Sequence, residues 1–476
     1  MKKTKIVCTL GPSSSDESII EEMLHSGMNV ARLNFSHGTH EEHKELINRF
    51  RKVRDRLGLP AAVMLDTKGP EIRLGNFENG SVVLKDGNEF TLTSNEVSGT
   101  ENHATISYGT LPRQLQPGND VLIDDGSVSL KVLECSDTDI VCKIINGGKI
   151  GNHKGVNVPK VHLEMEYLSD RDKSDLLFGI ENDVDFIAAS FVRSKEDVIE
   201  LRKFLDYNGG HTIKIISKIE NLDGVNNFDE ILKHSNGIMV ARGDMGVEIE
   251  YERLPGIQKK FIKSCYQAGK MVITATQMLE SMINSPHPTR AEITDVANAV
   301  FDGTSAIMLS GESAMGKYPV VAVKVMAKIA EQAERDAFEM KAYSGIKYDM
   351  DSTDTTNAIC DATCTTARDL NAKAIIAVTK FGHTARRMSK FRPYEPIVAA
   401  TPDVKTFHQL SLSWGVYPVM SKNQLSSDDL FRHAIACAKQ IDLVSDGDRV
   451  VITAGIPLDT AGNTNILKVE FVGNKN

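Results

Sequence analysis

The sequence IKIISKIENLDGV, at residues 213–225, joins a hydrophobic strand to two charged side chains at its end. Apolar β-branched residues dominate 213–219, which predicts a buried β-strand. Side chains two positions apart on a strand point to the same side, so Lys218 and Glu220 should emerge together. A buried charge is costly unless it is paired or coordinated. For an isolated Lys-x-Glu the simplest interpretation is a structural ion pair. Whether this interpretation applies here depends on the other residues of the chain.

Short apolar runs alternate with amphipathic helical patterns up to about residue 340, which is typical of β–α units. The predicted strands are 5–10, 30–33, 61–65, 185–189, 213–217, 237–240, 271–274 and 305–309. Helical patterns fill most gaps, for example 16–26, 41–57, 169–180 and 320–334. Eight such units predict an α/β fold, a (β/α)8 TIM barrel, over 1–69 and 169–343.

One stretch breaks the alternation. Between Asp66 and Ser169 the sequence has short apolar runs, many Gly and Asn, and few helical patterns. The triplet at 124–126, Asp-Asp-Gly, is a hairpin-turn signal flanked by apolar residues. We predict a small inserted all-β domain over 70–168. An insertion after the third strand overhangs the mouth of a barrel, so we expect this domain to be a lid.

A second change of pattern follows the barrel. Residues 344–354 are polar, with a cluster of Asp, Ser and Thr, and predict a linker. Beyond it, apolar runs at 374–379, 396–400, 449–453 and 466–471 predict the strands of a C-terminal α/β domain within 344–476.

The composition narrows the possible partners and compartment. The 476-residue chain carries a net charge of −9, which argues against a nucleic-acid-binding surface. Its seven cysteines are scattered, and the close pair Cys360 and Cys364 falls in a helical pattern, as expected for buried thiols in a reducing cytoplasm. The N-terminus has no signal-peptide core, and no apolar run is long enough to span a membrane. We therefore expect a cytoplasmic protein.

Polar residues gather just past the predicted strands, at the end where barrels of this type carry their chemistry. They are Arg32, Asn34, Ser36, His37, Asp66, Thr67, Lys68, Arg73, Lys218, Glu220, Arg242, Gly243, Asp244, Thr276, Ser310 and Glu312. Any one of them could be a helix cap or loop residue. The recurrence of cations and carboxylates after five strands indicates a shared site.

The residue types in this set favour phosphoryl chemistry. Glu220 and Asp244 are hard oxygen ligands on neighbouring strands, a common way to hold Mg²⁺. Arg32, Arg73 and Lys218 are cations facing the same mouth, as a phosphorylated anion requires. The small residues of 242–246, RGDMG, would let backbone amides approach an anion, although a tight turn explains them equally well.

Six motifs carry a family resemblance. They are RLNFSHG (32–38), LDTKGPEIR (65–73), ISKIEN (216–221), MVARGDMG (239–246), TATQMLESM (274–282) and GTSAIMLSGE (303–312). Their order and spacing resemble pyruvate kinase over essentially the whole chain, in the bacterial type without an extra C-terminal domain. The resemblance implies phosphoryl transfer from phosphoenolpyruvate to ADP, giving pyruvate and ATP in the last step of glycolysis.

The resemblance also implies roles for individual residues. Lys218 is expected to stabilise the transferring phosphoryl group, with Arg32 in contact with it. Glu220 and Asp244 would bind Mg²⁺ or Mn²⁺, which leaves Lys218 to face the phosphoryl group instead of neutralising Glu220. The substrate carboxylate is expected at Gly243, Asp244 and Thr276.

Two further sites follow from the resemblance at the barrel mouth. The nucleotide is expected near Asn34, His37, Arg73 and Lys154. A monovalent-cation site for K⁺ is expected at Asn34, Ser36, Asp66 and Thr67. Glu71 is the residue that K⁺-dependent members carry, where K⁺-independent members tend to have Lys.

The segment TKFGHTAR, at 379–386, follows a predicted strand and opens a helix. Hydroxyls and amides at a helix N-terminus suit a phosphate, and an ordinary capped helix is the alternative. In the family this loop binds a sugar-phosphate activator, here implying Thr379, Lys380, Gly382, His383 and Thr384. The partner loop at 454–465 resembles the family less closely, so the effector could be a sugar phosphate or a nucleotide. Family members are usually homotetramers.

Two other functions are weighed against this one. A Mg²⁺-dependent lyase or aldolase of the phosphoenolpyruvate/pyruvate barrels would share the barrel and the metal carboxylates. It would not need Arg73, the lid with Lys154 or the monovalent-cation set. A catalytically inactive sugar-phosphate sensor would be expected to have lost Lys218, Glu220 or Asp244.

Overall fold

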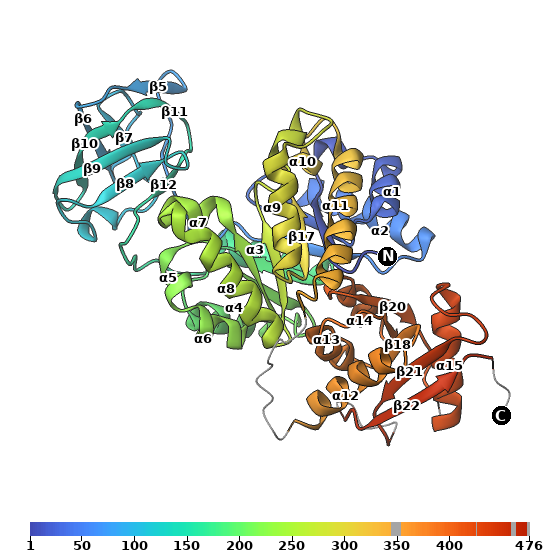
Figure 1. Ribbon diagram of the computed structural model, residues 1–476. Helices are drawn as coiled ribbons and strands as arrows, with labels where there is room; N and C mark the ends of the chain where they lie inside the picture. The colour runs from blue at the N-terminus through green and yellow to red at the C-terminus, as the bar shows by residue number, and fades with distance from the viewer. Residues whose placement is uncertain (344–353, 425, 458–462, 474–476) are drawn as a thin grey trace.

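The computed structural model describes residues 1–343, 354–424, 426–457 and 463–473 (Figure 1). Nearly all of the predicted linker, 344–353, lies outside these residues. Figure 1 shows three bodies along the chain: an inserted β-sheet region, a central barrel ringed by helices, and a C-terminal α/β region packed under the barrel.

The predicted barrel is confirmed. Eight parallel strands close in the order β1-β17-β16-β15-β14-β13-β3-β2. They are β1 (Lys5–Thr9), β2 (Val30–Asn34), β3 (Ala62–Asp66), β13 (Phe186–Ala189), β14 (Lys214–Ile219), β15 (Gly237–Ala241), β16 (Met271–Ala275) and β17 (Ala306–Leu309). β14 ends at Ile219, as the apolar run 213–219 predicts and two residues beyond the strand at 213–217, so Lys218 lies on the strand itself and Glu220 directly follows it.

Helices cover the outside of the barrel, and local sequence explains where they begin. They are α1 (Glu17–Ser26), α2 (His40–Leu57), α3 (Asp170–Glu181), α4 (Lys195–Tyr207), α5 (Leu222–Asn226), α6 (Phe228–His234), α7 (Arg242–Glu248), α8 (Leu254–Gln267), α9 (Arg290–Phe301), α10 (Gly311–Ala314) and α11 (Pro319–Glu339). Capping boxes at Thr39 and Ser169 start α2 and α3. The longer helices, α1, α2, α4, α8 and α11 among them, bury an apolar face in the barrel core.

The inserted region is all β apart from one short turn of 3₁₀-helix. Its larger sheet has the order β4-β12-β8-β9-β10-β6-β7, and β11 pairs with β5. The strands are β4 (Ile72–Arg73), β5 (Ser81–Leu84), β6 (Glu89–Thr93), β7 (His103–Thr105), β8 (Asp120–Ile123), β9 (Val128–Cys135), β10 (Asp139–Asn146), β11 (Gly148–Gly151) and β12 (Gly155–Asn157). The predicted hairpin turn is confirmed between β8 and β9, where Asp124, Asp125 and Gly126 all have positive φ.

The C-terminal region is a five-stranded sheet in the order β20-β19-β18-β21-β22, with only β22 antiparallel to its neighbour. The strands are β18 (Ala374–Val378), β19 (Ile397–Thr401), β20 (Val416–Met420), β21 (Arg449–Ala454) and β22 (Ile466–Phe471). Helices α12 (Thr355–Asp369), α13 (His383–Lys390), α14 (Val404–Gln409) and α15 (Ser427–Gln440) pack on it. β20 is absent from the sequence-based prediction because Pro418 interrupts its apolar run, which an edge strand tolerates.

Two predictions from composition can be compared with this structure. Cys360 and Cys364 lie in α12 and are buried free thiols, as expected. In the part of the chain that the structure describes, no helix has the length and apolar character needed to cross a membrane.

Candidate active site

A cluster of buried charges lies at the carboxyl ends of β2, β3 and β14. The Lys218 Nζ atom lies 3.0 Å from an Asp66 oxygen and 3.0 Å from a Glu220 oxygen. It also donates to the Ser190 hydroxyl at 2.7 Å. Lys218 and Glu220 therefore form the ion pair that an isolated Lys-x-Glu predicts, because a buried charge is stabilised by an opposite charge beside it.

Arg32 completes the cluster from β2. Its Nε atom donates to the second Asp66 oxygen at 2.6 Å, and Nη1 donates to the Thr9 hydroxyl at 2.8 Å. Asp66 thus lies between two cations and is fully buried. The predicted catalytic residues Arg32 and Lys218 are brought together by one carboxylate, Asp66, for which the family resemblance implies a place in a monovalent-cation site.

Burial and charge act against each other on these groups. Burial alone would raise the pKa of Asp66, but Arg32 and Lys218 together lower it. Burial alone would lower the pKa of Lys218, but Asp66 and Glu220 raise it. Lys218 is therefore a fixed positive charge at neutral pH, suited to stabilising an anion and unsuited to giving up a proton.

Glu220 has the environment of a metal ligand. Burial raises its pKa to about 7; Lys218 opposes this shift and Asp244 adds to it. One Glu220 oxygen accepts from the Phe191 amide at 2.7 Å, which fixes the carboxylate. Asp244 is a second carboxylate near this one, since its charge also raises the Glu220 pKa, and two neighbouring carboxylates suit a divalent cation. No described group of three or more His, Cys, Asp or Glu side chains could hold a metal, so further ligands would come from substrate or water.

Thr276 is held in a strained conformation beside the start of α7. Its φ is +67°, which is rare for a β-branched residue. The Thr276 hydroxyl accepts from the Gly243 amide at 2.8 Å, and the Arg242 guanidinium donates to the Thr276 carbonyl at 2.6 Å. Strain of this kind needs surrounding structure to maintain it and often marks a functional site. Gly243, Asp244 and Thr276 are thus brought to one place, as predicted.

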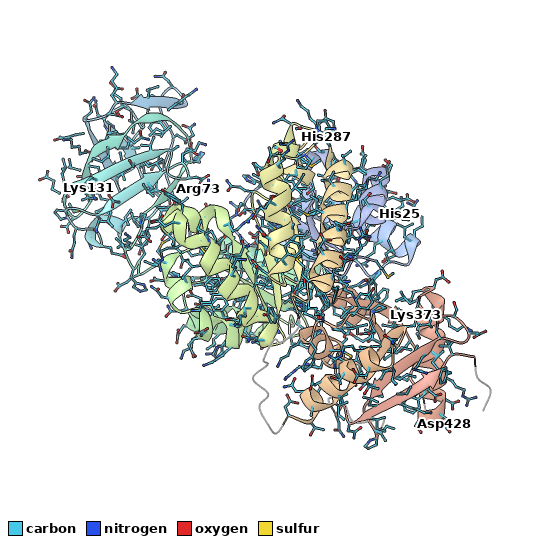
Figure 2. The ribbon with its side chains drawn as sticks, viewed as in Figure 1. His25, Arg73, Lys131, His287, Lys373 and Asp428 are labelled. Carbon is cyan, nitrogen blue, oxygen red and sulfur yellow. The ribbon has the colours of Figure 1, made fainter. Side chains whose placement is uncertain are left out.

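Three of the four predicted nucleotide residues, His37, Arg73 and Lys154, lie between the barrel and the inserted sheet, whereas Asn34 lies at the end of β2 and does not line the cavity there. A cavity of about 640 Å³ there is lined by His37, Arg73, Lys154 and Asp244 among others. Arg73 lies at the edge of the inserted sheet that faces the barrel (Figure 2) and pairs with Glu71 at 2.5 Å. Lys154 pairs with Asp124 at 2.8 Å. The two cations are already balanced by carboxylates of their own region and are only partly buried.

The predicted monovalent-cation residues are only partly brought together. The Asn34 side chain accepts from the Ser36 amide at 3.2 Å. Thr67 is buried, and its hydroxyl accepts from the Ser190 amide at 3.1 Å and lies 3.4 Å from the Ala188 carbonyl. Both Asp66 oxygens already bind cationic side chains. Asn34 and Asp66 are register partners on adjacent strands β2 and β3, so the four residues share one corner of the mouth.

Comparison with known proteins decides the family. The family model described as pyruvate kinase, barrel domain, matches residues 1–323, and that described as pyruvate kinase, alpha/beta domain, matches 357–470. The chain belongs to the pyruvate kinase family. Pyruvate kinase from Clostridium acetobutylicum is 49% identical over 473 residues, covering 99% of this chain and 100% of the relative. That from Staphylococcus haemolyticus is 48% identical over 477 residues, covering 100% of this chain and 81% of the relative.

A solved structure agrees. The crystal structure of a pyruvate kinase from Cryptosporidium parvum superposes with a TM-score of 0.90 at 41% identity, covering 99% of this chain and 96% of that one. The chain is accordingly a pyruvate kinase enzyme, a phosphotransferase of glycolysis. The lyase or aldolase and the inactive sensor are set aside.

The pyruvate kinase barrel also contributes residues that sequence reasoning missed. Ser190 follows the fourth barrel strand, β13, and bonds to Lys218, Asp66 and the Thr67 carbonyl. Thr9 ends the first strand and bonds to Arg32. Both are polar residues at the carboxyl end of a barrel strand, so the same rule that found the other residues would have found these two.

The predicted effector loop of this pyruvate kinase lies far from the mouth, in the C-terminal region. Gly382, with φ of +76°, precedes α13, and no side chain caps that helix. The Thr384 and Thr464 hydroxyls lie 2.7 Å apart, while Lys380 and His383 are exposed and Thr379 is buried. The partner loop is described only in part, because 458–462 lie outside the described residues.

Proposed function

We propose that Lys218 and Arg32 carry the phosphoryl transfer. The observation that supports this most directly is the Lys218 ammonium, which is buried and charged where three polar strand ends meet. Preorganised charge in a site shielded from water is the main source of catalysis for phosphoryl transfer. Arg32, fixed by Asp66 and Thr9, would hold a phosphoryl oxygen from the other side.

The divalent cation is proposed at Glu220 and Asp244. Bound Mg²⁺ or Mn²⁺ supplies positive charge that neutralises substrate and phosphoryl oxygens. When the metal is bound, Glu220 would bind it in place of the Lys218 ammonium. Lys218 would then be available to donate to the phosphoryl group. This reconciles the observed ion pair with a catalytic role, since the pair keeps Lys218 charged and in place beforehand.

The substrate carboxylate is proposed at the Gly243 and Asp244 amides and the Thr276 hydroxyl. The Gly243 amide and the Thr276 hydroxyl are 2.8 Å apart and would both turn to a carboxylate oxygen. Phosphoenolpyruvate would then have its carboxylate held at β15 and β16 and its phosphoryl group at β2 and β14.

The division of labour along the chain is also proposed. Residues 1–69 and 169–343 form the catalytic barrel, 70–168 the lid and 344–476 a regulatory domain. Arg73 and Lys154 would swing with the lid onto the ADP phosphates, with Asn34 and His37 contacting the nucleotide from the barrel. Closure excludes water, which would otherwise compete with ADP for the phosphoryl group.

K⁺ is proposed at Asn34, Ser36, Asp66 and Thr67, supported by their shared corner of the mouth. An activating sugar phosphate or nucleotide is proposed at Thr379, Lys380, Gly382, His383 and Thr384. We further propose a cytoplasmic homotetramer, on the strength of the family alone.

One titration tests the core of this proposal. Initial rates of ATP and pyruvate formation are measured against phosphoenolpyruvate, with and without Mg²⁺, K⁺ and candidate effectors. We expect the initial rate to depend on both cations. We also expect one effector to lower the phosphoenolpyruvate concentration that gives the half-maximal rate. Full activity with a metal chelator present would contradict the Glu220–Asp244 assignment. An effector response that survives Thr384→Val would contradict the effector loop.

A further inference from the structure

The chain crosses between the barrel and the inserted sheet twice. The first crossing lies between β3 and β4 and contains Gly69; the second lies between β12 and α3 and ends at Ser169. Figure 1 shows the inserted sheet standing away from the barrel. The two crossings are the segments of chain that join the sheet to the barrel. Any movement of the proposed lid has to bend both of them.

One carboxylate bonds to both crossings. Asp172, on the first turn of α3, is 1% exposed. One of its oxygens accepts from the Gly69 amide at 2.9 Å, and the other accepts from the Ser169 hydroxyl at 2.5 Å and the Ser169 amide at 3.2 Å. Among the described residues no cation pairs with Asp172, so these donors balance its charge.

The first crossing also packs closely against Ser190, a residue of the candidate active site. Gly69 has a φ of +72°, and a Cβ there would lie 2.9 Å from the Ser190 Cβ and 3.0 Å from the Ser190 carbonyl oxygen. Only glycine can therefore pass so close. Because Ser190 bonds to Lys218, the Gly69 peptide lies directly over the residue that positions the catalytic ammonium.

The helix that bears Asp172, α3, also contacts the loop that follows β2 at the mouth of the barrel. Arg171 donates to the Phe35 carbonyl at 2.9 Å, and Asp175 pairs with His40 at 2.6 Å. The segment between Phe35 and His40 contains His37, a proposed nucleotide contact. The first turns of α3 therefore bond both to the crossing that contains Gly69 and to the loop between Phe35 and His40. This fixes the two segments relative to each other.

We propose that Asp172 is a positioning residue that ties the two lid crossings together, so that the lid closes about one fixed axis. The proposal rests on the lid function proposed above. Without the tie, Gly69 and Ser169 would move independently, and Arg73 and Lys154 would meet the ADP phosphates in many orientations. Misplacement of about 1 Å can cost on the order of 100-fold, so a tenfold or larger effect on ADP use is reasonable.

Three variants separate this role from simple helix capping. Asp172→Ala removes both halves of the tie. Ser169→Ala removes the cap of α3 and the bond from the Ser169 hydroxyl, but it leaves the bonds that Asp172 accepts from the Gly69 and Ser169 amides. Asp170→Asn, at an exposed position in the same helical turn, removes one charge near the helix N-terminus and neither bond. Lys154→Ala reports separately on whether the lid contacts nucleotide.

Two readouts are measured on the full-length enzyme. Hydrogen exchange at the Gly69 amide should accelerate in Asp172→Ala and stay near wild type in the other three variants. The KM for ADP should rise about tenfold in Asp172→Ala, with the KM for phosphoenolpyruvate nearly unchanged. Should Asp172→Ala not fold, Asp172→Asn keeps the volume and replaces one acceptor with a donor, and the same criteria apply.

The outcomes are distinct. Equal changes in Asp172→Ala and Ser169→Ala would reduce Asp172 to a helix-capping residue and overturn the inference. So would an unchanged KM for ADP in Asp172→Ala when Lys154→Ala raises it. An unchanged KM for ADP in Lys154→Ala would instead refute the lid function itself, and the inference with it.

Discussion

Replacing Lys218 with Met tests the central cluster, because it removes the charge and keeps much of the side-chain length. Lys218 contacts Asp66 and Glu220 at 3.0 Å each. At an effective dielectric constant of about 20, one such contact is worth roughly 5 kcal/mol before desolvation. Removing one partner of a buried pair costs about 3–5 kcal/mol in measured cases. Arg32 still neutralises Asp66, so most of the loss falls on Glu220 and we expect about 3 kcal/mol.

The effect on stability should depend on pH. The pKa of Glu220 is already raised to about 7, and loss of Lys218 raises it further. A raised folded-state pKa means that the folded protein holds this proton more tightly than the unfolded chain does. The variant should therefore be least stable relative to wild type at pH 8, and the difference should shrink as the pH falls through 7. Urea unfolding at pH 6 and pH 8 measures this.

The effect on turnover should be larger. A cation that stabilises a phosphoryl transition state contributes about 10³–10⁵-fold, or roughly 4–7 kcal/mol. Coupled initial-rate assays on protein verified as folded by circular dichroism should show this loss. Lys214→Met is the matched control, because Lys214 lies on the same strand at the opposite end of the barrel. Near wild-type turnover of folded Lys218→Met, or an equal loss in Lys214→Met, would refute the reasoning.

Three further predictions address the neighbouring groups. Mn²⁺ affinity should weaken by up to about tenfold per pH unit below pH 7, because protons compete with metal for Glu220; a flat profile from pH 6 to 8 by titration calorimetry would argue against this ligand. Activity should rise with K⁺ and fall in tetramethylammonium, and Glu71→Lys should reduce that difference; equal rates in both salts would remove the K⁺ site. Thr276→Ala should raise the KM for phosphoenolpyruvate about tenfold or more while Thr276→Ser stays close to wild type, since only the hydroxyl bonds to the Gly243 amide; similar values for the two variants would exclude the hydroxyl.

Much of the fold follows from local sequence. The eight barrel strands are short, mostly apolar runs, as expected of strands buried on both faces, and helical patterns separate them. The hairpin turn at Asp124–Asp125–Gly126 follows from turn chemistry alone. β20 escaped prediction because Pro418 weakens its pattern, and only its place at the sheet edge makes that proline acceptable.

The site divides along a different line. The sequence by itself determined which residues stand at the strand ends, because strand direction and the barrel rule place them at one mouth. The sequence could not determine which of these side chains bond to one another. Lys218 bonds to Asp66 across 152 residues and to Ser190 across 28, and Asp172 reaches Gly69 across 103. Such pairings depend on distances of a few ångströms between strands and loops, which no spacing along the chain encodes. Barrel closure brings these groups together, and burial then makes each charge take the nearest partner available.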